Sequence, residues 1–138
     1  MNITETCKRV KSASLRLAAA DSELKNKALL NIAKVLSENK DKILKANQED
    51  VERSKSENIP APLLKRLRFD EAKLNEVLDG IHSLVRLDDP VGKTLLSTEL
   101  DDGPELYKVT CPIGVTGIIF ESRPDALVQI STLCLKSG

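Results

Sequence analysis

The chain has 138 residues, of which 41% are hydrophobic and 30% charged, a composition typical of one globular domain with a core of its own. Its 21 basic and 21 acidic residues balance, and it has only two Phe, one Tyr and no Trp, so there is neither an overall field to attract nucleic acid nor a set of rings for bases to stack on. Because no apolar run reaches the roughly 18 residues of a membrane span and the start lacks an apolar signal segment, we expect a cytoplasmic protein that binds neither nucleic acid nor membranes.

Helical periodicity dominates the first half of the sequence. A first helix is predicted near residues 3–17, with its apolar residues on one buried face: Ile3, Cys7, Val10 and Leu17. Asp21 and Ser22 can cap a second helix that ends near Asn39. Its apolar stripe is Leu29, Ile32, Ala33 and Leu36. A third helix, from about 41 to 57, is mostly polar and should face water.

The fourth long helix has the clearest pattern. After Pro60, Pro62 and a short helical turn at residues 63–67, Asp70 can cap it and Asp88-Asp89-Pro90 should end it. Its inward residues are Leu74, Val77, Leu78, Ile81, Leu84 and Val85. His82 lies beside this stripe, and we expect a boundary histidine that finds a hydrogen-bond partner, because it has no nucleophile or second ligand nearby to assist.

The period changes to that of strands after Gly92. Alternating residues from Thr94 to Leu100, turn chemistry at 102–104 and a β-rich run at 106–111 predict a hairpin. The apolar run 115–120 predicts a strand buried on both faces of a parallel sheet. A polar loop follows, and Asp125 can cap a final helix that ends at Gly138. The inward face of that helix is expected to be Leu127, Ile130, Leu133 and Cys134.

A parallel strand requires a crossover to a second parallel strand, and this sequence supplies only the first strand and its crossover helix. A lone strand of this type would expose two apolar faces and two backbone edges, which soluble proteins avoid. We therefore expect either that another chain covers it or that the sequence is a fragment.

One loop has a plausible chemical role: residues 121–125, Glu-Ser-Arg-Pro-Asp. Ligands in open α/β sheets bind at the carboxyl ends of strands. Arg123 can fork onto a carboxylate or phosphate, and the amides at the start of the next helix favour anions. The structural alternative is that Glu121 and Arg123 pair with each other or a neighbour, while Asp125 only caps the helix.

Other motifs indicate structure rather than chemistry. Gly114 and Gly117 lack the spacing of a dinucleotide fingerprint and are expected to allow a turn and close packing. The basic cluster at residues 65–68 should be the solvated side of a helix. The three cysteines, Cys7, Cys111 and Cys134, form no C-x-x-C pair, and the chain has only one histidine. We therefore expect buried, reduced thiols, with no metal site and no nucleophile among them.

Several phrases resemble γ-glutamyl phosphate reductase, a branch of the aldehyde dehydrogenase superfamily. They are LDDPVGK from Leu87, ELDDGPELYKVTCPIGVTGIIFESRPDAL from Glu99 and LCLKSG from Leu133, with ILKANQEDVERSK and LLKRLRFDEAKL upstream. The likeness covers nearly the whole chain, and IFESRPD and LCLKSG are specific to this branch.

The resemblance implies an α/β, aldehyde-dehydrogenase-like fold: an amino-terminal helical layer, an oligomerisation hairpin and the first βα unit of a Rossmann-like parallel sheet. By this likeness residues 1–92 are the helical part of the cofactor-binding domain and 93–111 the hairpin of the oligomerisation domain. Residues 112–138 are then the truncated first strand, loop and helix of the Rossmann-like domain. A homo-oligomer is expected for the full-length enzyme.

The implied activity is the NADPH-dependent reduction of L-glutamyl 5-phosphate to glutamate 5-semialdehyde, with release of phosphate, in proline synthesis. A family cysteine attacks the acyl phosphate, and the resulting thioester takes hydride from the cofactor. The likeness puts residues 121–125 beside the nicotinamide and the acyl group. Glu121, Ser122, Arg123 and Pro124 are then expected to contact NADP, and Arg123 and Asp125 the substrate.

The same resemblance implies that this chain is an amino-terminal fragment without the catalytic cysteine. Members are roughly three times as long, and none of the three cysteines matches the nucleophile motif, so no catalytic residue and no activity are expected of the chain alone. Two alternatives remain open: a non-catalytic oligomerisation or interaction module derived from this family, and a dehydrogenase of the same superfamily acting on another acyl phosphate or aldehyde.

Overall fold

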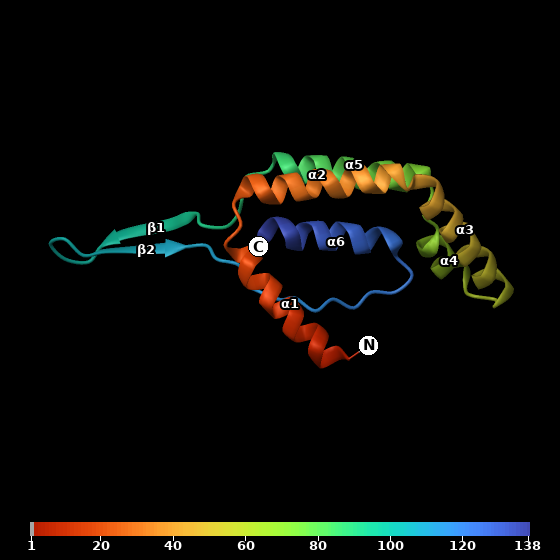
Figure 1. The fold of residues 1–138 in the computed structure, drawn as a ribbon, viewed down its shortest axis with the longest axis horizontal. Coiled ribbons are helices and arrows are strands. Elements are labelled where there is room, and N and C mark those ends of the chain that lie inside the picture. The colour runs from red at the N-terminus through yellow and green to blue at the C-terminus, as the bar shows by residue number, and fades with distance from the viewer. Residues whose placement is uncertain (1) are drawn as a thin grey trace.

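The computed structural model describes residues 2–138, which form helices and one two-stranded antiparallel sheet. The elements are α1 (Ile3–Ala18), α2 (Ser22–Glu38), α3 (Lys40–Ser56), α4 (Ala61–Leu67), α5 (Glu71–Arg86), β1 (Thr94–Glu99), β2 (Glu105–Val109) and α6 (Pro124–Ser137). The helices α2, α5 and α6 lie side by side, the β1–β2 hairpin projects from one end, and α3 and α4 lie at the other (Figure 1). No helix in residues 2–138 is both long and apolar enough to cross a lipid bilayer.

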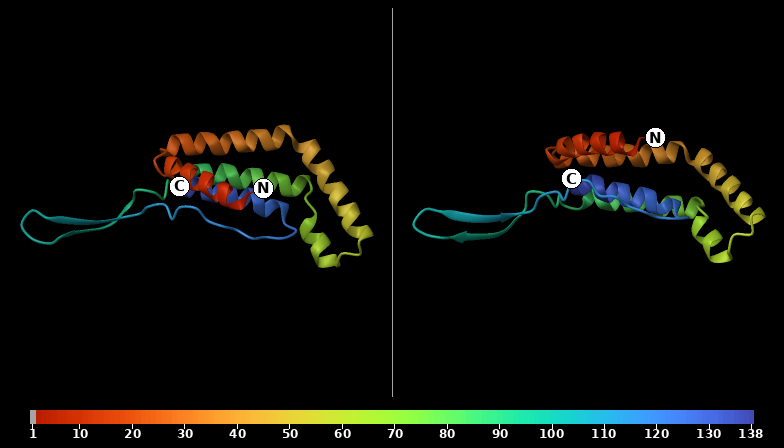
Figure 2. Two further views of the ribbon diagram at one scale, coloured as in Figure 1. Left: turned by 60° about the horizontal axis from the view of Figure 1, so that its bottom comes forward. Right: turned by 90° about the horizontal axis from the view of Figure 1, so that it is seen from below.

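The core lies where α2 and α5 pack together, with α6 against both, as the views in Figure 2 also show. The predicted stripes of α2 and α5 are confirmed as its centre. The buried members are Leu29, Ala33, Leu74, Val77, Ile81 and Leu84, joined by Phe69. Burial of each large apolar side chain contributes about 1.5–3 kcal/mol, so α5, which supplies four of these seven, is the main scaffold.

Two predicted caps are confirmed and set where the long helices begin. Asp21 accepts a hydrogen bond from the Leu24 amide at 2.7 Å, and Asp70 accepts one from the Lys73 amide at 3.1 Å. Each satisfies an amide that the first helical turn leaves without a partner, an interaction that contributes about 0.5–2 kcal/mol. As predicted, α5 ends before Asp88-Asp89-Pro90.

The polar helix α3 contributes one buried residue, Asn47. Its side chain donates to the Leu67 carbonyl at 2.9 Å and accepts from the Phe69 amide at 2.7 Å. These two bonds fix the connection between α4 and α5, so α4 folds back along α3.

The predicted hairpin is confirmed. β1 and β2 pair in the register Ser97 with Tyr107 and Thr98 with Leu106, with an irregularity between Thr94 and Leu96. Gly103 has φ +100° in the connecting loop, a conformation that glycine adopts without strain. Every residue of both strands is exposed, so this arm packs against nothing in the described chain.

The predicted strand at residues 115–120 is not part of a sheet in this structure. The segment crosses from the hairpin to the start of α6 without pairing, and Ile119 is fully exposed while Phe120 is 45% exposed. The expectation of burial on both faces was wrong for the described chain, because β1 and β2 form a separate sheet and no second parallel strand is present among residues 2–138.

The predicted inward faces of α1 and α6 were also wrong. α1 has no buried residue, and Ile3 is 73% exposed. On α6 the residues Leu127, Leu133 and Cys134 are exposed, whereas Val128 and Leu135 pack against the core. α6 is apolar on more than one side, so periodicity alone could not identify the side facing α2 and α5, whereas the apolar face of α1 is simply not buried against any other element among residues 2–138.

The cysteines follow from these two corrections. Cys7, Cys111 and Cys134 are free but exposed rather than buried, because α1, the segment after β2 and the outer face of α6 lack a covering layer. His82 is exposed on α5 and forms no hydrogen bond within residues 2–138, so the predicted partner is absent there. The basic cluster at residues 65–68 is solvated, as predicted.

Candidate functional site

The loop at residues 121–125 lies at the start of α6, at the end of that helix farthest from Gly138 (Figure 1). Glu121 and Arg123 are exposed. Ser122 has φ +51°, in the left-handed region that few non-glycine residues adopt. Arg123 occupies the position before the helix, where its carbonyl accepts from the Ala126 amide at 3.1 Å, and Pro124 is the first helical residue. The turn therefore directs Glu121 and Arg123 to the surface.

Asp125 does not cap α6, contrary to the prediction. It lies inside the first turn, and its Oδ1 atom is buried without a hydrogen-bond partner among residues 2–138. A buried carboxylate oxygen without a donor costs about 1–3 kcal/mol. This acceptor therefore has unused capacity for a donor from outside the described chain.

The loop has the chemistry of one wall of an anion site. No ion pair joins Arg123 to Glu121 or to any other described carboxylate, so the internal pairing considered from the sequence is not formed. A free guanidinium beside amides at a helix start attracts phosphate or carboxylate groups. The binding of a phosphate-bearing cofactor by this loop stays a prediction, and residues 121–125 line none of the three best-formed cavities among residues 2–138.

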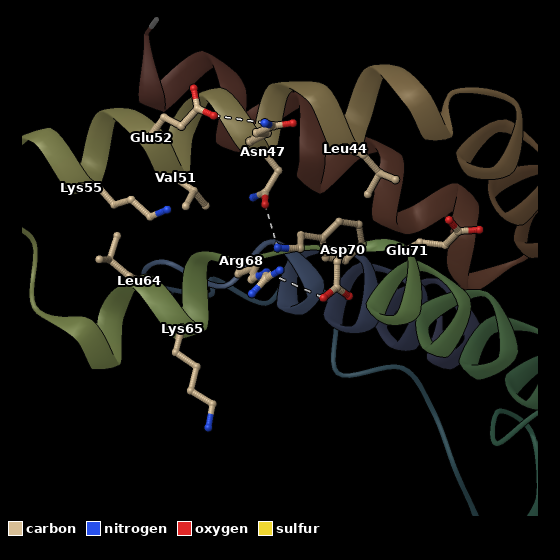
Figure 3. A pocket seen from close by; sticks show the side chains of 12 residues that line it. Leu44, Asn47, Val51, Glu52, Lys55, Leu64, Lys65, Arg68, Asp70 and Glu71 are labelled. Carbon is tan, nitrogen blue, oxygen red and sulfur yellow. Dashed lines mark hydrogen bonds and ion pairs between the residues drawn. The ribbon is translucent and has the colours of Figure 1, made fainter.

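A hollow of about 590 Å³ lies between α3 and α4 (Figure 3). Its lining is mixed: apolar side chains such as Leu44 and Val51 lie beside Asn47 and Gln48, and it also includes three basic residues (Lys55, Lys65 and Arg68) and three acidic residues. Arg68 is within 3.9 Å of Asp70, and Lys65 points away from the hollow in Figure 3. Because the charges are mixed and do not converge on one point, this hollow is a weaker candidate than the loop.

A second hollow of about 410 Å³ separates α5 and α6. Its walls are largely apolar and include Ile81, Leu84, Val128 and Leu133. It has no convergent polar groups to orient a small molecule. In residues 2–138 no group of three or more His, Cys, Asp or Glu side chains is arranged to hold a metal ion.

A buried charged cluster that the sequence analysis missed lies where the hairpin leaves the helices. Lys25 is 2% exposed, and its Nζ atom is 3.1 and 3.4 Å from the Asp89 carboxylate oxygens. Lys136 is 3% exposed and donates to Asn26 at 2.7 Å and to the Val85 carbonyl at 3.4 Å. One sequence signal could have revealed Lys25, which precedes Leu29 by four residues and so lies on the buried stripe of α2.

The surroundings of Asp89 favour its charged form. Burial acts to raise the pKa of this carboxyl, but the Val91 amide, Lys25 and Lys136 outweigh it, and the pKa of Asp89 is lowered from its ordinary value. The Val91 N–H donates to Asp89 at 2.9 Å. The carboxylate is therefore held by the chain on both sides, from α2 and from its own turn.

Comparison with curated proteins gives matches along the whole chain. It is 72% identical over 138 residues to the γ-glutamyl phosphate reductase of Acetivibrio thermocellus and 68% identical to that of Pelotomaculum thermopropionicum. Each match covers 100% of this chain and 32% of the relative. No family model matches the chain.

Solved structures agree with this sequence similarity. The γ-glutamyl phosphate reductase of Thermotoga maritima superposes with a TM-score of 0.94 at 36% identity, covering 99% of this chain and 33% of that one. The enzyme of Saccharomyces cerevisiae gives a TM-score of 0.95, also at 36% identity, and covers 99% and 35%. The chain corresponds to the amino-terminal part of γ-glutamyl phosphate reductase.

The match to γ-glutamyl phosphate reductase confirms the resemblance and the helical layer with its hairpin. The chain spans about a third of the length of these relatives. The roles of Glu121, Ser122, Arg123, Pro124 and Asp125, and the three domain assignments, remain predictions.

Proposed function

We propose that this chain contributes the amino-terminal part of an enzyme that reduces L-glutamyl 5-phosphate to glutamate 5-semialdehyde, with NADPH as the hydride donor and phosphate as the leaving group. The observation that carries the proposal is the whole-chain match to γ-glutamyl phosphate reductases, at 72% identity to the Acetivibrio relative. The reductase name also implies a nicotinamide cofactor; the preference for NADP and a place in proline synthesis belong to this proposal.

The described residues would serve binding rather than bond breaking. Arg123 would hold a phosphate or carboxylate group, because its guanidinium is exposed and free of an internal carboxylate. Asp125 would accept a hydrogen bond from substrate or from a residue elsewhere in the enzyme, because its Oδ1 has no donor in residues 2–138. Glu121, Ser122 and Pro124 would line the cofactor side of the same turn.

The nucleophile is expected outside this sequence. Cys111 and Cys134 are free and exposed, but exposure alone does not activate a thiol, because a reactive thiolate also needs a nearby positive charge or base. Cys7 lies on α1, which packs loosely against the rest. The chain by itself is therefore proposed to be inactive.

A second candidate function is a non-catalytic interaction module. The observation in its favour is the fully exposed hairpin, whose strands include Leu95, Leu96, Leu106, Tyr107 and Val109. A two-stranded hairpin is marginally stable alone, so such an arm is suited to packing against another copy or against the remainder of a longer enzyme. An interaction role for the hairpin and a place in the reductase are compatible, because the arm could pack against another copy in a homo-oligomeric enzyme.

The deciding experiment uses a chimera in which this sequence replaces the corresponding residues of the Acetivibrio relative. NADP reduction is followed with glutamate semialdehyde and phosphate. Phosphate-dependent turnover by the chimera supports the proposal, and turnover by the 138-residue chain alone would contradict the placement of the nucleophile. A preference for a substrate without the glutamyl group would instead favour another acyl-phosphate or aldehyde dehydrogenase.

A further inference from the structure

Three segments meet at the point where the hairpin leaves the helices. They are the first turn of α2, the turn after α5 and the last turn of α6, and they contribute Lys25, Asp89 and Lys136, which we call the arm hub. Figure 1 shows these segments converging at the end of the helical layer from which β1 and β2 project. The arm hub therefore lies where the chain passes from α5 into the β1–β2 arm and where it comes back toward the helices after β2.

The arm root, residues 90–93 and 110–112, is bonded directly to the arm hub. The Asp89 carboxylate accepts from the Val91 amide at 2.9 Å while it binds Lys25 at 3.1 Å. Two hydrogen bonds join the two segments of the root. The Gly92 amide donates to the Thr110 carbonyl at 2.9 Å, and the Thr110 amide donates to the Lys93 carbonyl at 3.0 Å. A continuous set of bonds thus runs from α2 into the arm.

The end of α6 closes the other side of the root. A Cβ atom on Gly138 would lie 2.8 Å from Pro112 Cγ and 3.3 Å from Val91 Cγ2, so helix and root are in close contact there. Two residues earlier, Lys136 donates to Asn26 of α2 and to the Val85 carbonyl at the end of α5. The arm root is consequently held between α2, α5 and α6.

Stability alone is a poor explanation for two lysines that are 2% and 3% exposed. The desolvation of buried ions offsets much of their attraction, and apolar residues of similar size often serve stability equally well. The Asp89 carboxylate, however, must keep both the Lys25 Nζ atom and the Val91 amide within hydrogen-bond distance, a restriction that an apolar contact does not impose. The value of the charged groups here is the fixed geometry of the turn at Asp89.

We propose that Lys25, Asp89 and Lys136 are positioning residues that fix the direction of the β1–β2 arm relative to the helical layer. Lys25 aligns the Asp89 carboxylate, Asp89 orients the turn through the Val91 amide, and Lys136 holds the end of α6 against α2 and α5. The arm then leaves the body at one angle, ready to meet whatever partner surface it packs against.

The test is amide hydrogen exchange on the protein of the printed sequence, comparing Lys25→Met with the wild type. Exchange at the root amides of Gly92 and Thr110 should accelerate by at least about tenfold. In the wild type, opening of the root must also break the ion pair between Lys25 and Asp89, and this energetic cost is absent in the variant. Exchange at Ile81, in the middle of α5, should change much less. Lys93→Met is the matched control, because Lys93 pairs with Asp88 at 3.0 Å on the surface beside the hub and is half exposed.

A second variant protects the test against a failure of Lys25→Met to fold. Asp89→Asn keeps an oxygen for the Val91 amide but removes the charge that binds Lys25, and it should also accelerate exchange at the root more than at Ile81. The proposal is overturned if root and α5 amides accelerate equally in the variant that folds, or if Lys93→Met loosens the root as much as Lys25→Met.

Discussion

Arg123 and Lys25 show two uses of a cation in one chain. Arg123 is exposed, lacks an internal carboxylate and lies at a helix start. Lys25 is buried and binds Asp89 through both carboxylate oxygens. The first is available to an external anion and the second is committed to the structure, so substitutions at the two positions should have different consequences.

Arg123→Lys in the chimera should lower kcat/KM about 10 to 100-fold, because a point charge cannot reproduce bidentate binding and a charge-assisted bond contributes roughly 1.5–3 kcal/mol. The melting temperature should stay the same. Arg66→Lys is the control, since Arg66 is exposed on α4. If Arg123→Lys lowers the melting temperature with normal kcat/KM, Arg123 is a structural residue.

Asp89 predicts a pH dependence of stability. Its folded-state pKa is lowered, so its contribution is present above the unfolded pKa of about 3.9 and is lost as the pH falls through the folded value. At pH 7, Asp89→Asn should lower the free energy of unfolding by about 1 kcal/mol, the pair being partly open to water. The groups that face Asp89 are Lys25 from α2 and Lys136 from α6.

Urea unfolding at pH 7 and at about pH 3 measures this difference between wild type and Asp89→Asn. It should shrink at the lower pH, because the contribution of a carboxylate with a lowered pKa begins to be lost once the pH falls below the unfolded pKa of about 3.9. Asp88→Asn is the control, because Asp88 is exposed and pairs only at the surface. A difference that is equal at both pH values would show that the Asp89 charge does not stabilise the fold.

Single residues were predicted well where a local rule acts. Asp21 and Asp70 cap helices because the capping oxygen needs only the next turn of its own chain. Asp125 looked equivalent but lies two positions beyond the cap position, which Arg123 occupies because α6 starts at Pro124. The Lys25 and Asp89 pair joins residues 64 positions apart, and no local pattern predicts such a contact.

The elements divide in the same way. The stripes of α2 and α5 predicted the core because each helix has one wide apolar face and that face meets the other. On α6 apolar residues surround more of the helix, so its inward face depends on neighbours rather than on period, whereas α1 has one apolar face that is not buried among residues 2–138. The run 115–120 has the composition of a strand, but a strand exists only where a second backbone pairs with it.

Ile119 tests whether this run becomes a buried strand in the longer enzyme. Ile119→Asp in the 138-residue chain should leave the melting temperature unchanged, because Ile119 is fully exposed there. The same substitution in the chimera should destabilise by several kcal/mol, the cost of burying an unpaired charge between apolar layers. Thermal unfolding of both pairs is the measurement, and an unaffected chimera would mean that this segment stays at the surface.

At the scale of the whole molecule, α2, α5 and α6 form a small core flanked by a free arm, an uncovered α1 and an unpaired apolar segment (Figure 1). The chain spans only about a third of the length of its γ-glutamyl phosphate reductase relatives. The sequence could predict the similarity to γ-glutamyl phosphate reductase through the resemblance of its motifs. Physical patterns alone could not, since they identify only an exposed arginine before a helix at residues 121–125 and no reaction.

The most direct test of the proposed function is the rate of NADP reduction by the chimera with the Acetivibrio relative, using glutamate semialdehyde and phosphate. Because the two sequences are 72% identical over this part, the chimera should retain kcat/KM within about tenfold of its parent, equivalent to about 1.4 kcal/mol, and should require phosphate. A folded chimera without phosphate-dependent turnover would contradict the assignment of this chain to the reductase.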